Sequence, residues 1–259
     1  MKERLKKDGF LKTGIKGFDA LIDQGIPIGT SNLVEGGPGS GKTIFCLSVA
    51  MHTCQQGKKV LYMSFEEPEF RLRRHLKNFG WNPEEYEKKG LLVIKRFNAL
   101  DIARSVEALL SEAKKELLID VQPVLIPTGF DPDLVLIDSL SSIASAFSGE
   151  ESRFRIYMEQ LFRYLESHEM TSLLIREVAN PTHVGSTFVE PGGAVSFLSD
   201  GIIAIYNVIY NTGKRERALE VIKMRGIDID RRIVQAEIRK KAGFIVHSDT
   251  TLKGSYKLT

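Results

Sequence analysis

The sequence predicts an α/β fold in which a mainly parallel β-sheet continues into antiparallel strands at its C-terminal side. Three observations predict this fold. Apolar, strand-like runs alternate with helical patterns as far as residue 175, a glycine-rich turn joins the first long strand to its helix, and strand-like runs follow one another directly beyond residue 200. Alternation of strand and helix is typical of a parallel sheet, whereas consecutive strands pair antiparallel.

Each element of this fold follows from its own pattern. The run 59–65 (KVLYMSF) is apolar almost throughout, as in a parallel strand buried on both faces. Phe154, Met158, Leu161 and Leu165 recur at helical spacing, which predicts a helix whose apolar stripe packs into the core. We expect strands over 30–35, 59–65, 91–97, 134–137, 171–175, 202–209, 217–224, 234–239 and 244–246. We expect helices over 42–55, 68–79, 102–118 and 149–168, with loops over 119–132 and 178–194.

Length and composition are those of an ordinary globular chain. The 259 residues are 42% hydrophobic and 27% charged, with a formal net charge of +3, which neither requires nor excludes a nucleic-acid partner. We expect a basic lead-in over residues 1–12 and a single domain over 13–259. The N-terminus is too charged for a signal peptide, and no apolar run reaches about 18 residues. We therefore expect a cytoplasmic protein, in which Cys46 and Cys54 are buried, inert thiols.

A phosphate-binding loop is the clearest motif in the chain. Residues 36–43 have the sequence Gly-Gly-Pro-Gly-Ser-Gly-Lys-Thr, which satisfies GxxxxGK[ST] between a predicted strand and a predicted helix. Glycines let successive N–H groups turn inward around an anion, and the helix adds the positive end of its dipole. Lys42 is expected to reach the β- and γ-phosphates of ATP, and the Thr43 hydroxyl to bind Mg²⁺. Nucleotide contacts are expected from Gly37, Pro38, Gly39, Ser40, Gly41, Lys42, Thr43 and Ile44.

Asp138 ends an apolar strand, where the carboxyl edge of a parallel sheet opens onto a ligand crevice. A carboxylate there can hold Mg²⁺ through water, so Thr43 and Asp138 form the expected metal site. The alternative is that Asp138 caps the segment that follows. The next residue is Ser139, so the glutamate that many phosphate-loop ATPases carry at that position is missing.

Glu66 and Glu67 offer a replacement for the missing glutamate. They follow the strand 59–65, which we expect to lie beside the strand of the phosphate loop, with its end near the γ-phosphate. One carboxylate could then deprotonate water while the other raises its pKa or points away, and we favour Glu66 as the base. The alternative is that both residues only favour the start of the next helix.

The motifs together resemble the RecA/RadA superfamily, and most closely its single-domain archaeal KaiC-like ATPases. The resemblance covers about residues 13–246 and implies a RecA-type three-layer fold, ATP hydrolysis and a cytoplasmic ATPase. It is carried by the phosphate loop, by Ser64-Phe-Glu66-Glu67, whose counterpart supplies catalytic carboxylates in that family, and by further segments at 13–29, 79–91 and 199–203.

The resemblance also gives a role to Lys223-Met224-Arg225-Gly226. In KaiC-type hexamers a matching K-x-R-G motif reaches the ATP of the neighbouring subunit, so Lys223 and Arg225 are expected to act in trans on the γ-phosphate of a homo-oligomeric ring, with a hexamer as the expected form. Alternate residues of a strand share a face, so both side chains can point the same way while Met224 packs inward. Where recombinases have a polar sensor, this chain has Arg176-Glu177, for which an internal ion pair or phosphate sensing are both open. No autophosphorylation site can be matched, so no kinase activity is inferred.

Two other functions remain open. The first is a RadA-like ATPase that binds single-stranded DNA in recombination, because residues 190–194 (Glu-Pro-Gly-Gly-Ala) resemble a DNA-binding loop. Residues 177–200 contain no Lys or Arg, however, and a loop without cations is a poor DNA ligand. Basic residues gather instead at 214–217, 231–232 and 239–241, where a solvated or interface-facing edge is the better interpretation. The second is a nucleotide-gated scaffold with little turnover.

Overall fold

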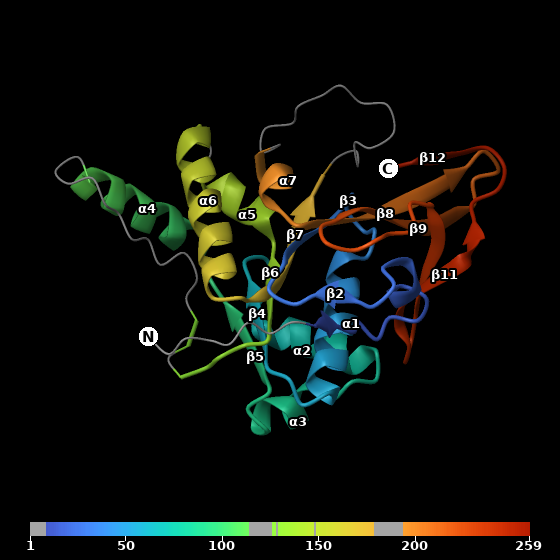
Figure 1. Ribbon diagram of the computed structural model, residues 1–259, viewed down its shortest axis with the longest axis horizontal. Helices are drawn as coiled ribbons and strands as arrows, with labels where there is room; N and C mark the ends of the chain where they lie inside the picture. Colours follow the sequence, from blue (N-terminus) through green and yellow to red (C-terminus); the bar gives the residue numbers. More distant parts are fainter. Residues whose placement is uncertain (1–8, 114–125, 128, 148, 179–193) are drawn as a thin grey trace.

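The computed structural model describes residues 9–113, 126–127, 129–147, 149–178 and 194–259 of the chain. Within these residues, ten strands form one central sheet in the order β11-β10-β9-β8-β3-β7-β6-β4-β5, with β12 paired to β8 (Figure 1). The parallel strands are β3 (Ser31–Gly36), β4 (Val60–Ser64), β5 (Leu92–Arg96), β6 (Leu134–Asp138), β7 (Thr171–Glu177) and β8 (Gly201–Tyr210). The antiparallel strands are β9 (Arg215–Met224), β10 (Val234–Arg239), β11 (Gly243–Thr251) and β12 (Tyr256–Leu258). The predicted fold class is confirmed.

Helices cover both faces of the parallel half, which makes the fold three-layered (Figure 1). Apolar side chains of α1 and α2 pack on one face, and those of α4, α5 and α6 pack on the other. Because both faces are covered, β4 and β6 are buried along their whole length and carry apolar residues at nearly every position. The helices are α1 (Lys42–Gln55), α2 (Glu69–Asn78), α3 (Pro83–Lys88), α4 (Ala99–Ala113), α5 (Leu140–Ala146), α6 (Glu151–Ser167) and α7 (Ala194–Leu198), with a 3₁₀ turn at Asp19–Leu21.

The predicted apolar stripe on α6 is confirmed as core packing. Met158, Leu161 and Leu165 are buried against the sheet, and Phe154 packs against them from a partly exposed position. Cys46 and Cys54 are also buried and free, as expected. None of the helices in the described ranges is long and apolar enough to cross a membrane.

The order of the strands corrects one prediction. The strand β4, which precedes Glu66 and Glu67, lies between β6 and β5, and two strands separate it from β3. The phosphate-loop strand instead lies between β7 and β8. The expected adjacency of β4 and β3 is therefore wrong. The two glutamates nevertheless emerge at the carboxyl edge of the sheet, because all the parallel strands end there.

Several short elements have no counterpart in the predicted pattern. The strand β1 (Phe10–Leu11) pairs antiparallel with β2 (Ile26–Pro27), so part of the expected lead-in contributes a buried Leu11 to the core. Helix α3 begins at Pro83 with two glutamates in its first turn and Lys88 at its end, and these signals are typical of a helix. Helix α7 begins at the end of the expected loop 178–194, whose residues 179–193 lie outside the described part of the chain.

Candidate functional site

The phosphate loop leaves the sheet at Gly36 and enters α1 at Lys42. Gly39 and Gly41 have φ angles of 72° and 110°, which side chains with a Cβ rarely adopt. A Cβ on Gly36 would lie 2.2 Å from the backbone oxygen of Ile205 on the neighbouring strand β8. The loop therefore needs glycine for its backbone angles at two positions and for close approach of the sheet at a third.

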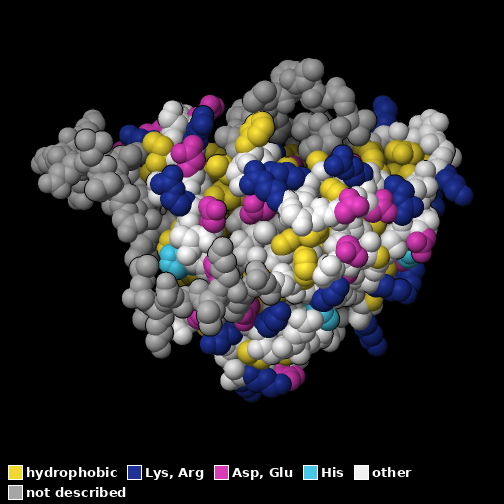
Figure 2. Space-filling view, in the orientation of Figure 1, with side chains coloured by type: hydrophobic (Ala, Val, Ile, Leu, Met, Phe, Trp, Pro, Cys, Tyr) yellow, Lys and Arg dark blue, Asp and Glu magenta, His cyan; other side chains and the backbone are white. Residues whose placement is uncertain are grey.

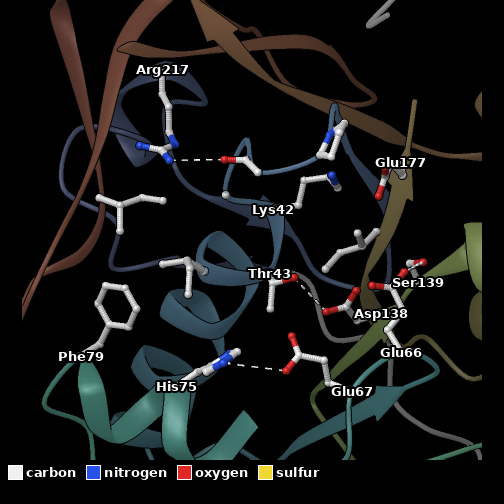
Figure 3. Close-up of a pocket in the computed structure, with 16 residues that line it drawn as sticks. Lys42, Thr43, Glu66, Glu67, His75, Phe79, Asp138, Ser139, Glu177 and Arg217 are labelled. Atoms are coloured by element: carbon white, nitrogen blue, oxygen red, sulfur yellow. Dashed lines mark hydrogen bonds and ion pairs between the residues drawn. The ribbon is translucent and has the colours of Figure 1, made fainter. Parts of the chain in front are cut away.

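Lys42, the first residue of α1, folds back over the loop that precedes it. Its Nζ donates hydrogen bonds of 2.9 Å to the backbone oxygens of Gly36 and Gly37. Burial lowers the pKa of Lys42, while the charges of Glu177, Asp138 and Glu66 act in the opposite direction. The ammonium group is thus held at the loop among three carboxylates, in the place where a phosphate group would meet it (Figure 3).

Asp138 joins three elements through one oxygen atom. Its Oδ2 accepts a 3.0 Å hydrogen bond from the Thr43 hydroxyl on α1 and a 2.6 Å hydrogen bond from the buried Tyr62 hydroxyl on β4. Burial raises the pKa of Asp138 to about 6, against the lowering effect of these two hydrogen bonds, and the charge of Glu66 adds to the rise. The expected pairing of Thr43 with Asp138 is present in the geometry.

The alternative role of Asp138 as a helix cap is wrong. Ser139 is the residue that caps α5, and its hydroxyl accepts a hydrogen bond from the backbone N–H of Ser142. The same two serines donate their hydroxyl hydrogens to Oε1 of Glu66, over 2.5 Å from Ser139 and 3.0 Å from Ser142. The residue that takes the place of the missing glutamate therefore contacts Glu66 itself.

Glu67 has different surroundings from Glu66. Its Oε2 lies 3.8 Å from Nε2 of His75 and 3.9 Å from Nε of Arg71, both on α2. Helix α2 begins at Glu69, beyond both glutamates, so neither belongs to its first turn. Arg71 and His75 thus face Glu67 on the α2 side, whereas the hydroxyl groups of Ser139 and Ser142 hold Glu66 on the Asp138 side. Figure 3 shows His75 beside Glu67.

A cavity of about 460 Å³ brings these groups together (Figure 3). The sequence-predicted residues that line it are Pro38, Gly39, Gly41, Lys42, Thr43, Ile44, Glu66, Glu67 and Asp138. The sequence did not indicate His75, Phe79, Ser139, Ile175, Arg217 and Ile238, which line it as well. Arg217 belongs to a basic cluster that we interpreted as a solvated edge, yet its Nη2 donates to the Gly39 oxygen over 3.3 Å. No local pattern marks Arg217 or Ile238, because the order of the strands in the sheet brings β9 and β10 to the loop.

Lys223 and Arg225 lie at the opposite edge of the sheet. Lys223 pairs with Ile202 at the start of β8, and Ile202 pairs with Leu33 near the start of β3, whereas the phosphate loop follows the end of β3. Lys223 donates to the backbone oxygen of Ser199, and Arg225 forms an ion pair of 3.2 Å with Asp200. Neither residue lines the cavity of its own chain as far as the described residues define it.

The two residues at the expected sensor position, Arg176 and Glu177, have different surroundings. Arg176 forms an ion pair of 3.0 Å with Glu35, whose side chain is almost fully buried, while that of Arg176 is partly buried. Glu177 instead lines the cavity near Lys42 (Figure 3). The internal ion pair is therefore present, and it is the following residue that faces the site.

The basic clusters elsewhere are interspersed with acids. Arg232, Arg239 and Lys214 each pair with an acidic residue two positions away in sequence. Figure 2 shows Lys and Arg side chains spread across one face among Asp and Glu, rather than gathered into one patch. This arrangement is typical of a solvated surface. Residues 190–193 of the segment that resembles a DNA-binding loop lie outside the described residues, and its last residue, Ala194, begins α7.

The chain has the features of the phosphate-loop class of nucleotide-binding proteins. These are a parallel sheet, a glycine-rich loop between β3 and α1, a buried lysine on that loop and a threonine–aspartate pair. The model of the family described as "ATPase: KaiC" matches residues 11–251. The chain belongs to this KaiC family of ATPases.

Two relatives and one solved structure show how widely the similarity extends. The chain is 28% identical over 236 residues to the circadian clock protein KaiC3 of Synechocystis, covering 91% of this chain and 45% of that protein. It is 30% identical over 250 residues to the UPF0273 protein PH0284 of Pyrococcus horikoshii, covering 94% of this chain and 96% of that protein. The crystal structure of the KaiC-like protein PH0186 from Pyrococcus horikoshii matches with a TM-score of 0.73 and 27% identity, over 93% of this chain and 99% of that one.

Proposed function

We propose that the chain binds Mg·ATP in the cavity at the carboxyl edge of its sheet and hydrolyses the bond to the γ-phosphate. One observation carries the proposal: the phosphate loop, the Thr43–Asp138 pair and two glutamates from a third strand line a single cavity. These are the phosphate, metal and base components that phosphoryl transfer to water requires.

The metal component fits Mg²⁺. Thr43 and Asp138 offer a hydroxyl and a carboxylate oxygen 3.0 Å apart, and oxygen ligands are those that Mg²⁺ prefers. The buried carboxylate is costly to ionise, as its raised pKa indicates, so a cation beside it would be stabilised. Bound there, Mg²⁺ would offset the negative charge of the phosphate oxygens. Lys42 would move from the Gly36 and Gly37 oxygens to the phosphates, which are stronger acceptors.

Glu66 is the base that the surroundings favour. The charge of Glu66 raises the pKa of both Asp138 and Lys42. The charge of Glu67 instead raises the pKa of Asp138 and of Tyr62. Hydroxyl groups of Ser139 and Ser142 hold the Glu66 carboxylate beside Asp138. Glu66 would take a proton from water as the water oxygen bonds to the γ-phosphorus. The bond from that phosphorus to its bridging oxygen then breaks, and ADP and inorganic phosphate form.

The apolar end of the cavity suits a nucleobase. Phe79, Ile238 and Ile44 are apolar residues that line it, and Phe79 lies across the cavity from Asp138 and Glu177 (Figure 3). Phe79 also stacks on Trp81, with ring centroids 5.6 Å apart. A flat aromatic base can stack on such a ring while its triphosphate reaches the loop. We assign this end of the cavity to adenine.

Lys223 and Arg225 are proposed to act in trans in a homo-oligomeric ring. They lie at the amino edge of the strands, so the triphosphate they could reach is that of another copy rather than their own. Lys223 donates to the backbone oxygen of Ser199 and Arg225 pairs with Asp200, both just beyond the end of α7. Met224, between them in the sequence, is buried. The added cations would counter charge that develops on the γ-phosphate.

Nucleotide binding and turnover by the purified chain test the proposal. We expect Mg-dependent release of phosphate from ATP, lost together with ATP affinity in Lys42→Ala. The matched control is Lys253→Ala, because Lys253 is an exposed lysine outside the cavity lining. Absence of ATP binding at millimolar Mg²⁺, or a Lys42→Ala variant equal to the control, would overturn the proposed function.

A further inference from the structure

The last described strand, β12, pairs with the same edge of β8 as β3 does, but further along β8. β3 pairs with β8 over Gly201–Ala204 and departs at Gly36 into the phosphate loop. β12 pairs with β8 over Val208–Tyr210, and the other edge of β8 is taken by β9. The C-terminal strand therefore continues the line of β3 on the far side of the loop.

Asn207 lies on β8 between these two pairings and touches the loop itself. Its backbone N–H donates to the Thr259 oxygen over 2.8 Å, and its backbone oxygen accepts from the Thr259 N–H over 3.0 Å. Its side-chain Nδ2 donates to the backbone oxygen of Pro38 over 3.2 Å. The main chain of Thr259 also lies against Gly37, since a Cβ there would be 3.5 Å from it. One residue thus connects the end of the chain to the tip of the phosphate loop.

A second side chain holds the next carbonyl of the loop. Arg217 is the cross-strand partner of Asn207 in the β8–β9 pair, and it donates to the Gly39 oxygen. Two neighbouring side chains of the antiparallel β8–β9 pair therefore bind two consecutive loop carbonyls, those of Pro38 and Gly39. Arg217 also lines the cavity, whereas Asn207 does not. The position of Asn207 lets it act on the nucleotide through the loop alone.

Holding a carbonyl also sets the direction of the next amide. A trans peptide carries its C=O and N–H on opposite sides, so the bond from Asn207 to the Pro38 oxygen turns the Gly39 N–H the other way. A phosphate nest works by aiming such N–H groups at the anion before it arrives. Gly39 has no side chain to hold it, and no atom would lie within 4 Å of a Cβ placed there. Its orientation thus depends on contacts to its peptide groups.

We propose that Asn207 is a positioning residue of the nucleotide site, which fixes the phosphate loop in its binding geometry and is itself fixed by main-chain pairing with Thr259. The inference rests on the proposed function, because the site it serves is the one assigned to Mg·ATP. It goes further in giving β8 and its antiparallel partner β12 a part in nucleotide affinity. Asn207 takes no part in the chemical step.

The test compares Asn207→Ala with Asn211→Ala. Asn211 is an exposed asparagine just beyond the end of β8, so its replacement makes the same chemical change without a loop contact. We expect Asn207→Ala to raise Kd and KM for Mg·ATP about two- to tenfold, as loss of one hydrogen bond does. We expect kcat to stay at the wild-type value and the melting temperature to match that of Asn211→Ala. A general packing defect would lower the melting temperature and kcat as well.

Amide hydrogen exchange without nucleotide supplies a second measurement. Residues 39–41 should exchange faster in Asn207→Ala than in wild type or Asn211→Ala, while the amides of β8 stay equally protected. An unchanged Kd with unchanged exchange, or a fall in kcat alone, would overturn the proposal. If Lys42→Ala loses ATP and Asn207→Ala does not weaken it, this inference fails while the proposed function stands. If the wild-type chain does not bind Mg·ATP, the proposed function fails and the exchange experiment still decides whether Asn207 holds the loop.

Discussion

Thr43 donates its hydroxyl to Asp138 across 3.0 Å and so joins the first turn of α1 to the end of β6, 95 residues away in the chain. The Asp138 atom that accepts this hydrogen bond also accepts the Tyr62 hydroxyl. Thr43 thus keeps beside it the carboxylate with which it is proposed to bind Mg²⁺.

Two replacements of Thr43 distinguish the contribution of its hydroxyl group from that of its branched shape. Thr43→Val keeps the branched side chain and removes the oxygen, so we expect Mg-dependent ATP affinity to fall about tenfold or more, as when a hydrogen bond to a charged group is lost. Thr43→Ser keeps the oxygen and should stay close to wild type. Titration of ATP with and without Mg²⁺ measures both variants. Equal loss in both would assign Thr43 a packing role instead.

Asp138→Asn should change the pH dependence of stability in EDTA. The folded pKa of about 6 lies above the ordinary 3.8, so the folded chain binds more protons between these values and loses stability as pH rises through them. Asparagine has no charge to bury, so the unfolding free energy of Asp138→Asn relative to wild type should rise between about pH 4 and 7, by up to about 3 kcal/mol.

Urea unfolding at several pH values measures this difference. Asp101→Asn is the control, because the Asp101 side chain is 67% exposed. Curves for Asp138→Asn and wild type that run parallel across the window would contradict the burial of an ionised carboxylate at this position.

Replacement of Glu66 and of Glu67 should lower the rate of single-turnover hydrolysis to different extents. Glu66→Gln keeps the acceptors for Ser139 and Ser142 but cannot take a proton, so the rate should fall by a factor on the order of 10² or more with little change in ATP affinity. Glu67→Gln should cost less, because His75 and Arg71 hold Glu67 on the α2 side. The larger loss in Glu67→Gln would transfer the role of base to that residue.

Mixing of two inactive variants tests action in trans. Lys42→Ala removes the loop lysine and Arg225→Ala removes the proposed partner cation, so each should be inactive alone. A mixed ring contains interfaces in which an intact loop meets an intact Arg225, and there activity should return. The control replaces the second chain by the double variant Lys42→Ala/Arg225→Ala, which can build no such interface. Mixed rings that stay inactive although sizing shows co-assembly would contradict the trans role.

Phe79 should contribute to affinity for the base rather than for the phosphates. Phe79→Ala removes the ring at the apolar end of the cavity, and loss of base stacking should weaken ATP about tenfold, while inorganic triphosphate binds as before. Phe79→Trp keeps an aromatic surface and should retain most of the affinity. Competition titrations with both ligands measure the difference, and equal weakening of triphosphate would place the effect elsewhere.

Local signals in the sequence were enough for the phosphate loop, for α1 and for Asp138 at the end of a buried strand. Each depends on residues that are neighbours in the chain, such as glycines at fixed spacing or an apolar run before a carboxylate. The place of β4 beside β6 could not be predicted in this way, because strand order follows from packing across the whole sheet. The same reason hid Arg217 and Phe79, which reach the cavity from segments whose own patterns are those of a surface strand and a helix end.

The serines after Asp138 illustrate an intermediate case. The sequence raised Asp138 as a possible cap, whereas Ser139 caps α5. That a base comes from another strand, because residue 139 is not a glutamate, stays a prediction. What the pattern could not give is the contact between Ser139 and Glu66, which lie 73 positions apart.

The pairing of β12 along the line of β3 connects Thr259 to the phosphate loop through Asn207. A force on Thr259 would act on its two hydrogen bonds to Asn207 and, through the side-chain amide of Asn207, on the backbone oxygen of Pro38. Tension or tethering at Thr259 would therefore loosen the phosphate loop and leave the buried strands in place.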